Sequence, residues 1–124
     1  MEELSAGKLV ETRSRFYAHL YHIDAAEDIT EILRQHRTRY KKANHHCYAH
    51  RFIDNQISIE RCSDDGEVGH PGKILLDILK QHHLDHHVLI VSRVFGGIKL
   101  GIGGVSRAFR DAGNSVVDQY KTKR

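Results

Sequence analysis

Three carboxylates stand close together in the segment Ser63–Glu67, which reads SDDGE. Asp64, Asp65 and Glu67 could hold a magnesium ion, because hard oxygen ligands grouped in this way suit that cation. One of these acids, with a raised pKa, could instead serve as a general base. The same residues are also typical of a structural turn, since Asp-Asp-Gly favours a turn and acids ahead of a helix help to cap it. The acidic loop is therefore a candidate site with an enzymatic and a structural interpretation.

A glycine-rich segment, VFGGIKLGIGGVSRAF, could bind an anion. The nucleotide-binding glycine patterns do not fit, because Ser106 stands where the dinucleotide fingerprint needs its third glycine, and GEVGHPGK has one residue too many for a P-loop. A helix that starts after Gly104 would still present free backbone N–H groups to a negative charge. The competing interpretation is that the glycines only allow sharp turns and close packing. The candidate anion contacts are Gly96, Gly97, Lys99, Gly101, Gly103, Gly104, Arg107 and Arg110.

Histidines and cysteines gather in the segment HHCYAH. A zinc site could combine His46 and His50, on one face of a strand, with Cys62 from a paired strand, but no C-x-x-C or H-E-x-x-H spacing supports it. Cys47 and His45 would share the other face, which is the arrangement that a thiol nucleophile needs. We expect neither a metal nor a cofactor, and we interpret both cysteines as free buried thiols.

Bulk composition limits the class of protein. The 124 residues, of which 40% are hydrophobic and 28% charged, suit one soluble globular domain. No run approaches the roughly 18 apolar residues of a membrane span, and the first residues lack the apolar centre of a signal peptide, so we expect a cytoplasmic protein. The formal net charge of +3 permits an anionic partner, and the 11 histidines would add positive charge below about pH 6.5.

The elements that must position these candidates follow from the hydrophobic period. Residues 1–7 are predicted to be a flexible terminus, and residues 8–23 to be extended, with an extra turn within that segment left open. Residues 24–43 have a helical period and begin with a capping box formed by Asp24 and Glu27. The residues that share one face of this helix are Ile29, Ile32, Leu33, His36 and Tyr40.

The second half of the chain contains the remaining predicted elements. HHCYAHRFI and ISIERCS predict a hairpin around DNQ, and Pro71 suits the first turn of the next helix. HVLIVSRVF is the most apolar strand, so we expect it at the centre of the sheet. A last helix begins at Val105 and is interrupted or strained near Gly113.

The predicted order is therefore β-α-β-β-α-β-α. It indicates an α+β fold, a two-layer sandwich with the helices on one face of a mixed four-stranded sheet. Residues 8–124 would form this single domain.

Three segments resemble the N-terminal domain of the IMPACT/YigZ family, namely NHHCYAHR, SDDGEVGHPGKILLDIL and VLIVSRVFGGIKLGIGGVSRAF. The resemblance extends from about Ser14 to Tyr120. Its most specific features are Asp-Asp-Gly-Glu, Arg93 and the pattern Gly-Gly-x-x-Leu-Gly. The sequence departs from the family at Val94, where a second aromatic is usual, and in a shorter turn after the acidic loop.

The resemblance implies a fold like the second domain of ribosomal protein S5. It also implies a connection with translation, since eukaryotic members regulate translation by binding the activator of an amino-acid-starvation kinase, and nucleic-acid binding has been proposed from the fold. This sequence shows neither the RWD-type domain of the eukaryotic regulators nor the ferredoxin-like domain of many bacterial members.

We therefore expect a non-enzymatic, cytoplasmic domain that acts in translation or its stress regulation by binding RNA, a ribosome-associated partner or a protein. One alternative is an enzyme that acts on a phosphorylated or nucleotide substrate through Asp64, Asp65, Glu67 and Arg93. Another is a pure protein-interaction module in which the basic helix end at Lys42 matters most. The predicted binding residues are Asp64, Asp65, Gly66, Glu67, Arg93, Gly96, Gly97, Lys99, Gly101, Gly103, Gly104, Arg107 and Arg110.

Overall fold

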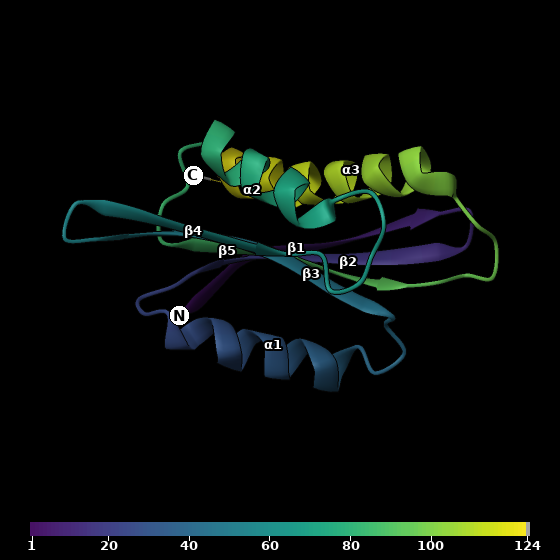
Figure 1. Ribbon diagram of the computed structural model, residues 1–124, viewed down its shortest axis with the longest axis horizontal. Coiled ribbons are helices and arrows are strands. Elements are labelled where there is room, and N and C mark those ends of the chain that lie inside the picture. Colours follow the sequence, from purple (N-terminus) through teal and green to yellow (C-terminus); the bar gives the residue numbers. More distant parts are fainter. Residues whose placement is uncertain (124) are drawn as a thin grey trace.

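The computed structural model describes residues 1–123, in which one five-stranded sheet carries helices on both faces (Figure 1). The strand order is β1-β2-β5-β3-β4, and every neighbouring pair is antiparallel. The α+β class is confirmed. In chain order the elements are β1 (Glu2–Glu11), β2 (Ser14–His22), α1 (Glu27–Arg39), β3 (His45–Asp54), β4 (Ile57–Ser63), α2 (Pro71–Gln81), β5 (His87–Val94) and α3 (Gly101–Lys123).

The prediction of a mixed four-stranded sheet was wrong in two respects, because the first strand was missed and the other four strands are all antiparallel. Residues 2–11 pair with β2 along their whole length, although the first seven were expected to be flexible. The two strands are joined by Thr12 and Arg13, which both have positive φ (46° and 69°). Such a turn usually carries Asn or Gly, so Thr12 and Arg13 did not indicate it. The β3–β4 hairpin was predicted correctly, and there Asn55 occupies the equivalent turn position (φ 49°).

The helices were expected on one face of the sheet, but α1 lies on the face opposite α2 and α3 (Figure 1). Alternate residues of β2 therefore enter two different cores. Phe16, Ala18 and Leu20 face α2 and α3, and Tyr21 faces α1. Strand β5 is at the centre of the sheet, as predicted, and it is buried along nearly all its length because both of its faces are covered.

The layer between α1 and the sheet is polar as well as apolar. His36 is buried, and its Nδ1 lies 2.9 Å from the Ser92 hydroxyl while its Nε2 lies 3.0 Å from the Tyr21 hydroxyl. Nδ1 of His46 lies 2.7 Å from the same Ser92 hydroxyl. These hydrogen bonds satisfy side chains that burial would otherwise penalise, and they connect α1 with β2, β3 and β5.

Helix α1 begins three residues later than predicted and is not capped by Asp24. The side chain of Asp28 instead accepts hydrogen bonds from the backbone N–H groups of Asp24 (2.9 Å) and Ala25 (3.2 Å). The predicted capping direction was therefore wrong. Pro71 does begin α2, as predicted. None of the helices within residues 1–123 combines the length and apolar character that crossing a membrane requires.

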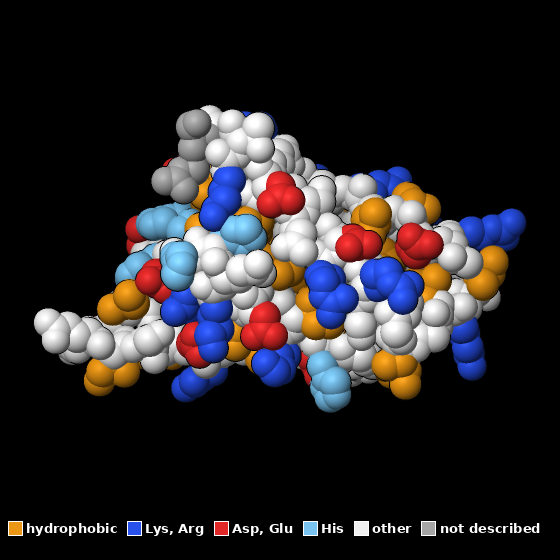
Figure 2. All heavy atoms as spheres, turned by 90° about the horizontal axis from the view of Figure 1, so that it is seen from above, with side chains coloured by type: hydrophobic (Ala, Val, Ile, Leu, Met, Phe, Trp, Pro, Cys, Tyr) orange, Lys and Arg blue, Asp and Glu red, His pale blue; other side chains and the backbone are white. Residues whose placement is uncertain are grey.

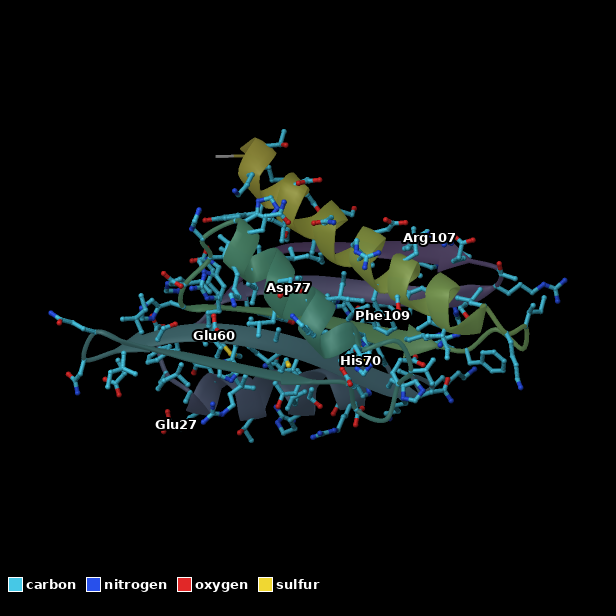
Figure 3. All side chains as sticks on the ribbon, turned by 45° about the horizontal axis from the view of Figure 1, so that its top comes forward. Glu27, Glu60, His70, Asp77, Arg107 and Phe109 are labelled. Atoms are coloured by element: carbon cyan, nitrogen blue, oxygen red, sulfur yellow. The ribbon has the colours of Figure 1, made fainter. Side chains whose placement is uncertain are left out.

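Helix α3 is amphipathic and separates charge from the core. Cations and acids are interspersed on the face formed by α2 and α3 (Figure 2). Arg107 points away from the sheet, whereas Phe109 points toward it (Figure 3). The Phe109 ring meets Phe16 edge-on, with ring centroids 5.1 Å apart. This contact anchors the first half of α3 on β2.

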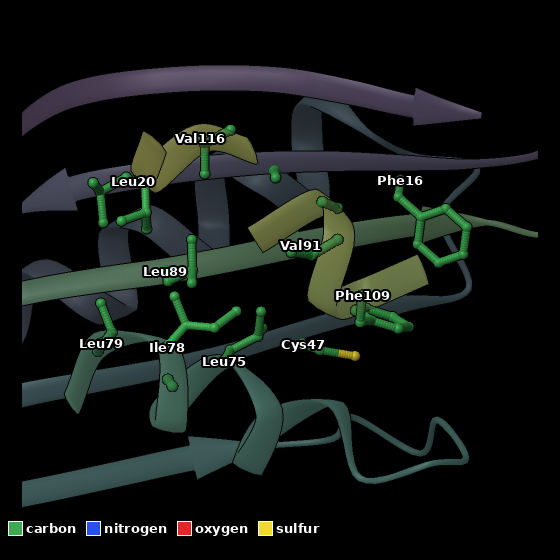
Figure 4. Packing of buried hydrophobic residues seen from close by; sticks show 14 of the residues in the cluster. Phe16, Leu20, Cys47, Leu75, Ile78, Leu79, Leu89, Val91, Phe109 and Val116 are labelled. Carbon is green, nitrogen blue, oxygen red and sulfur yellow. The ribbon is translucent and has the colours of Figure 1, made fainter. Parts of the chain in front are cut away.

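Helix α3 is continuous through Gly113, so the expected interruption was wrong. The glycine is needed for packing, because a Cβ there would lie 2.9 Å from Cδ1 of Ile78 and 3.0 Å from Cδ2 of Leu75. These two side chains lie together under α3 with Leu89 (Figure 4). The glycine thus allows α3 to approach α2 closely.

Gly113→Ala should lower the free energy of unfolding by about 1 kcal/mol. Overpacking a core lowers the free energy of unfolding by about 1–3 kcal/mol, and the better helix propensity of alanine offsets about 1 kcal/mol of this loss. Gly103→Ala is the matched control, since it lies in the same helix with nothing within 4 Å of the added Cβ, and it should not destabilise the protein. Urea denaturation of both variants measures the difference, and equal stabilities would contradict the packing role of Gly113.

Candidate functional site

The end of β5 and the glycine-rich segment meet around one cavity of about 500 Å³, and Val68, the residue after the acidic loop, lines it whereas Asp64, Asp65 and Glu67 do not. We call this cavity the apolar cleft. Its walls come from the start of β3, the loop before α2, the loop after β5 and the first turn of α3. The lining residues are Asn44, His45, Val68, Arg93, Phe95, Lys99, Leu100, Gly101, Ile102 and Val105.

Asp64 and Asp65 are engaged in holding the backbone. A carboxylate oxygen of Asp64 accepts the N–H of Gly72 at 2.8 Å, in the first turn of α2. A carboxylate oxygen of Asp65 accepts the N–H of His46 at 2.8 Å, at the start of β3. Both acids therefore satisfy N–H groups at the ends of elements, which is the structural role that the turn composition allowed.

Glu67 forms a buried ion pair with Arg93. Oε2 of Glu67 lies 2.8 Å from Nη1 of Arg93, and the two side chains are only 4% and 7% exposed. Nη2 of Arg93 donates to the Ser14 hydroxyl at 3.3 Å. The guanidinium carbon lies 5.4 Å and 5.7 Å from the ring centroids of Phe16 and Phe95, within the range of cation–π attraction. Nε of Arg93 has no hydrogen-bond partner within the described chain.

Neither the zinc nor the thiol interpretation is supported by the geometry. Within residues 1–123, no three His, Cys, Asp or Glu side chains are grouped so that they could hold a metal ion. Burial raises the pKa of the Cys47 thiol well above its usual range, and its Sγ donates to the Asp64 carbonyl at 3.1 Å. A thiol held protonated in this way is a poor nucleophile. Cys62 is exposed, so the expectation that both cysteines are buried was wrong for that residue.

The glycines of the segment after β5 serve different purposes. A Cβ at Gly96 would lie 2.2 Å from the Arg13 backbone, so this glycine makes room for the β1–β2 turn. Gly97 and Gly101 have φ values of +89° and +74°, which favour glycine. Helix α3 starts at Gly101, four residues before the predicted Val105, so Gly103 lies inside its first turn.

The predicted cations do not gather at one place. Lys99 lines the apolar cleft and also a neighbouring hollow of about 300 Å³ that contains Arg107. Glu11 and Asp111 line that hollow as well, so its charge is mixed. Arg110 is exposed and lines neither cavity. The role of these three cations as anion contacts stays a prediction.

The sequence interpretation missed the apolar rim of the cleft. Val68, Phe95 and Ile102 are 49%, 44% and 67% exposed. All three stand in or beside glycine-rich turns, where large apolar residues are unusual, and this was the available signal. A cluster of exposed apolar side chains around a concave site is typical of a surface that binds another molecule.

Comparison with known proteins agrees with the resemblance seen in the sequence. The family model described as the Impact N-terminal domain matches residues 12–117. The IMPACT family member YvyE of Bacillus subtilis (strain 168) is 34% identical over 110 residues, which make up 88% of this chain and 50% of that protein. The chain spans about half the length of the curated relatives it matches.

Two solved structures share the fold. A crystal structure of a hypothetical protein has a TM-score of 0.83 and 29% identity, over 96% of this chain and 62% of that one. The two-domain translational regulator Yih1 has a TM-score of 0.63 and 20% identity, over 95% of this chain and 46% of that one. The described domain thus corresponds to one part of longer proteins.

Proposed function

Since this chain belongs to the family of the Impact N-terminal domain, we propose that it is a non-enzymatic, cytoplasmic domain that acts in translation or its stress regulation. It works by binding a protein partner, free or associated with the ribosome, at the apolar cleft. The observation that carries this proposal is the rim of exposed Val68, Phe95 and Ile102 around a cavity of about 500 Å³. The shared fold of the translational regulator Yih1 supports the link with translation.

The occupied state of the acids favours binding over catalysis. Asp64 and Asp65 each accept a backbone N–H, and Glu67 neutralises Arg93. A general base needs a lone pair that can reach a substrate proton, and none of these three acids lines the apolar cleft, so none faces a molecule bound there. The enzyme interpretation makes a different prediction, namely that Asp65→Asn abolishes turnover of a phosphorylated substrate without changing stability.

The chemistry of the cleft suggests what the partner presents. An apolar side chain of the partner would fill the cleft and remove the rim from water, and central apolar anchors of this kind dominate many interfaces.

Ile102→Ser should weaken association with the partner about fivefold to thirtyfold, the equivalent of 1–2 kcal/mol for one apolar anchor. The measurement is co-sedimentation of the full chain with ribosomal fractions of an extract from its source organism, before and after nuclease treatment. Ile57→Ser is the matched control, because Ile57 is 65% exposed but lies at the β3–β4 turn. Equal association of Ile102→Ser and the wild type, or equal weakening by both variants, would contradict the proposal.

A further inference from the structure

A second surface, on the α1 side of the sheet, gathers cations around two tyrosines. The last turn of α1 and the residues after it lie over the β1–β2 hairpin, at the end where that hairpin turns (Figure 1). Two adjacent hollows of about 280 and 310 Å³ open there, and Tyr17, Arg39 and Tyr40 line both. We define the tyrosine–cation surface as Lys8, Arg15, Tyr17, Arg39, Tyr40, Lys41 and Lys42.

The tyrosines form a small aromatic platform. Their rings are stacked, with centroids 4.4 Å apart and planes at 18°, and each residue is half-buried. The hydroxyl of Tyr40 lies 2.6 Å from Nε2 of His19, which fixes its ring on the sheet. Nζ of Lys8 lies 5.9 Å from the Tyr17 centroid, and the Arg39 guanidinium 5.2 Å from the Tyr40 centroid. The platform is thus held by the fold while long cationic side chains lie against its rings.

The charge of this surface is unbalanced. The residues that line the two hollows include five cations and no carboxylate. None of the five forms a salt bridge with any described residue of the chain, although Arg51, Lys73 and Arg93 elsewhere do. Glu3, which pairs with Nδ1 of His19, is directed at the histidine. Five unpaired cations exceed the formal net charge of +3 for the whole chain, so this face favours an anionic partner.

We propose that the tyrosine–cation surface binds single-stranded RNA. Aromatic platforms within a cationic groove bind single strands because every base has a π-face, whereas the cations follow the phosphates. Lys8 and Arg39 can leave the ring faces to pair with phosphates, and the planar Arg39 guanidinium offers a further stacking surface. The choice of RNA over DNA rests on the proposed role in translation; the single-strand chemistry rests on the surface itself.

The location differs from the one that the sequence suggested. The glycine-rich segment supplied Arg107 and Arg110, but acids share the hollow that contains Arg107. Tyr17 and Tyr40 are 23 residues apart in the chain, and only the packing of α1 on β2 brings their rings together. RNA at this surface would leave the apolar cleft free, so the two sites can act independently.

Fluorescence anisotropy of a labelled oligo(U) with the full chain tests the proposal. Tyr17→Leu, which keeps apolar volume on the sheet, should weaken binding by about tenfold to a hundredfold, the range for one lost stacking contact. Lys41→Ala/Lys42→Ala should flatten the dependence of log Kd on log salt by about 1.4, if each lysine contacts one phosphate. Arg107→Ala/Arg110→Ala removes the same charge from the other face and should leave that slope unchanged. Thermal melting by circular dichroism checks that each variant is folded.

Several outcomes would overturn the proposal. The first two are no binding of oligo(U) and an equally flattened salt dependence of log Kd in both double variants. The others are an affinity for duplex RNA equal to that for oligo(U), and competition by poly-glutamate as strong as by unlabelled oligo(U), which would indicate an acidic protein as the partner. Equal affinity for oligo(dT) would overturn the choice of RNA. Ile102→Ser should bind oligo(U) normally, so a failure here is distinguishable from a failure of the proposed protein site.

Discussion

Glu67→Gln should lower the free energy of unfolding by about 3–5 kcal/mol, the usual cost of removing one partner from a buried ion pair. The Arg93 side chain is 7% exposed and has Glu67 as its anionic partner at 2.8 Å. Glutamine has nearly the shape of glutamate, but it leaves the guanidinium charge buried and unpaired. Urea denaturation at neutral pH measures the loss.

Two further variants decide whether the effect comes from buried charge. Glu60→Gln removes a carboxylate that lies 3.1 Å from Nε of Arg51, but Glu60 is 30% exposed and its loss should cost at most about 1 kcal/mol. Glu67→Gln/Arg93→Met removes both charges and should recover at least half of the loss. Similar costs for Glu67→Gln and Glu60→Gln would show that the buried pair contributes no more than a surface pair.

Lowering the pH from 7 to 5 should lower the free energy of unfolding by about 2 kcal/mol through His36 alone. Burial, then the neighbouring His19, His46 and Arg39, lower the pKa of His36 from 6.5 to about 3. In the unfolded chain this imidazole takes up a proton below about pH 6.5, whereas in the folded protein it stays neutral until about pH 3. The unfolded state therefore binds more protons throughout this window, and the stability that is complete above pH 6.5 declines as the pH falls.

The measurement is the free energy of unfolding in urea at several pH values between 7.5 and 4.5. His36→Gln cannot titrate, so its stability should fall less steeply with pH than that of the wild type, whatever its absolute stability. His70→Gln serves as the comparison for loss of an exposed imidazole, because the His70 side chain is 88% exposed. An unchanged slope in His36→Gln would show that acid sensitivity arises elsewhere, for example at His19, where burial also lowers the pKa.

The elements that the sequence predicted correctly are those specified by residues close together in the chain. The helical period from Ile29 to Tyr40 predicted α1, and Pro71 marked the start of α2, because both depend on contacts within a few residues. The apolar run of β5 predicted its central position, since only a strand covered on both faces tolerates such a sequence. The motifs around Asp64 and Gly96 identified the family for the same reason, as they are contiguous in the chain.

Tertiary structure decided what depends on distant partners. Strand β1 exists because β2 supplies its hydrogen bonds, and Thr12 and Arg13 gave no usual turn signal. Gly113 is explained by Ile78 and Leu75 of another helix rather than by a break in its own. In the same way, the tyrosine–cation surface arises only where the end of α1 packs over β2, and Glu67 meets Arg93 across 26 residues. The hydrophobic period of the sequence determines which face of an element is apolar. Packing determines on which side of the sheet α1 lies, and hence which side chains meet.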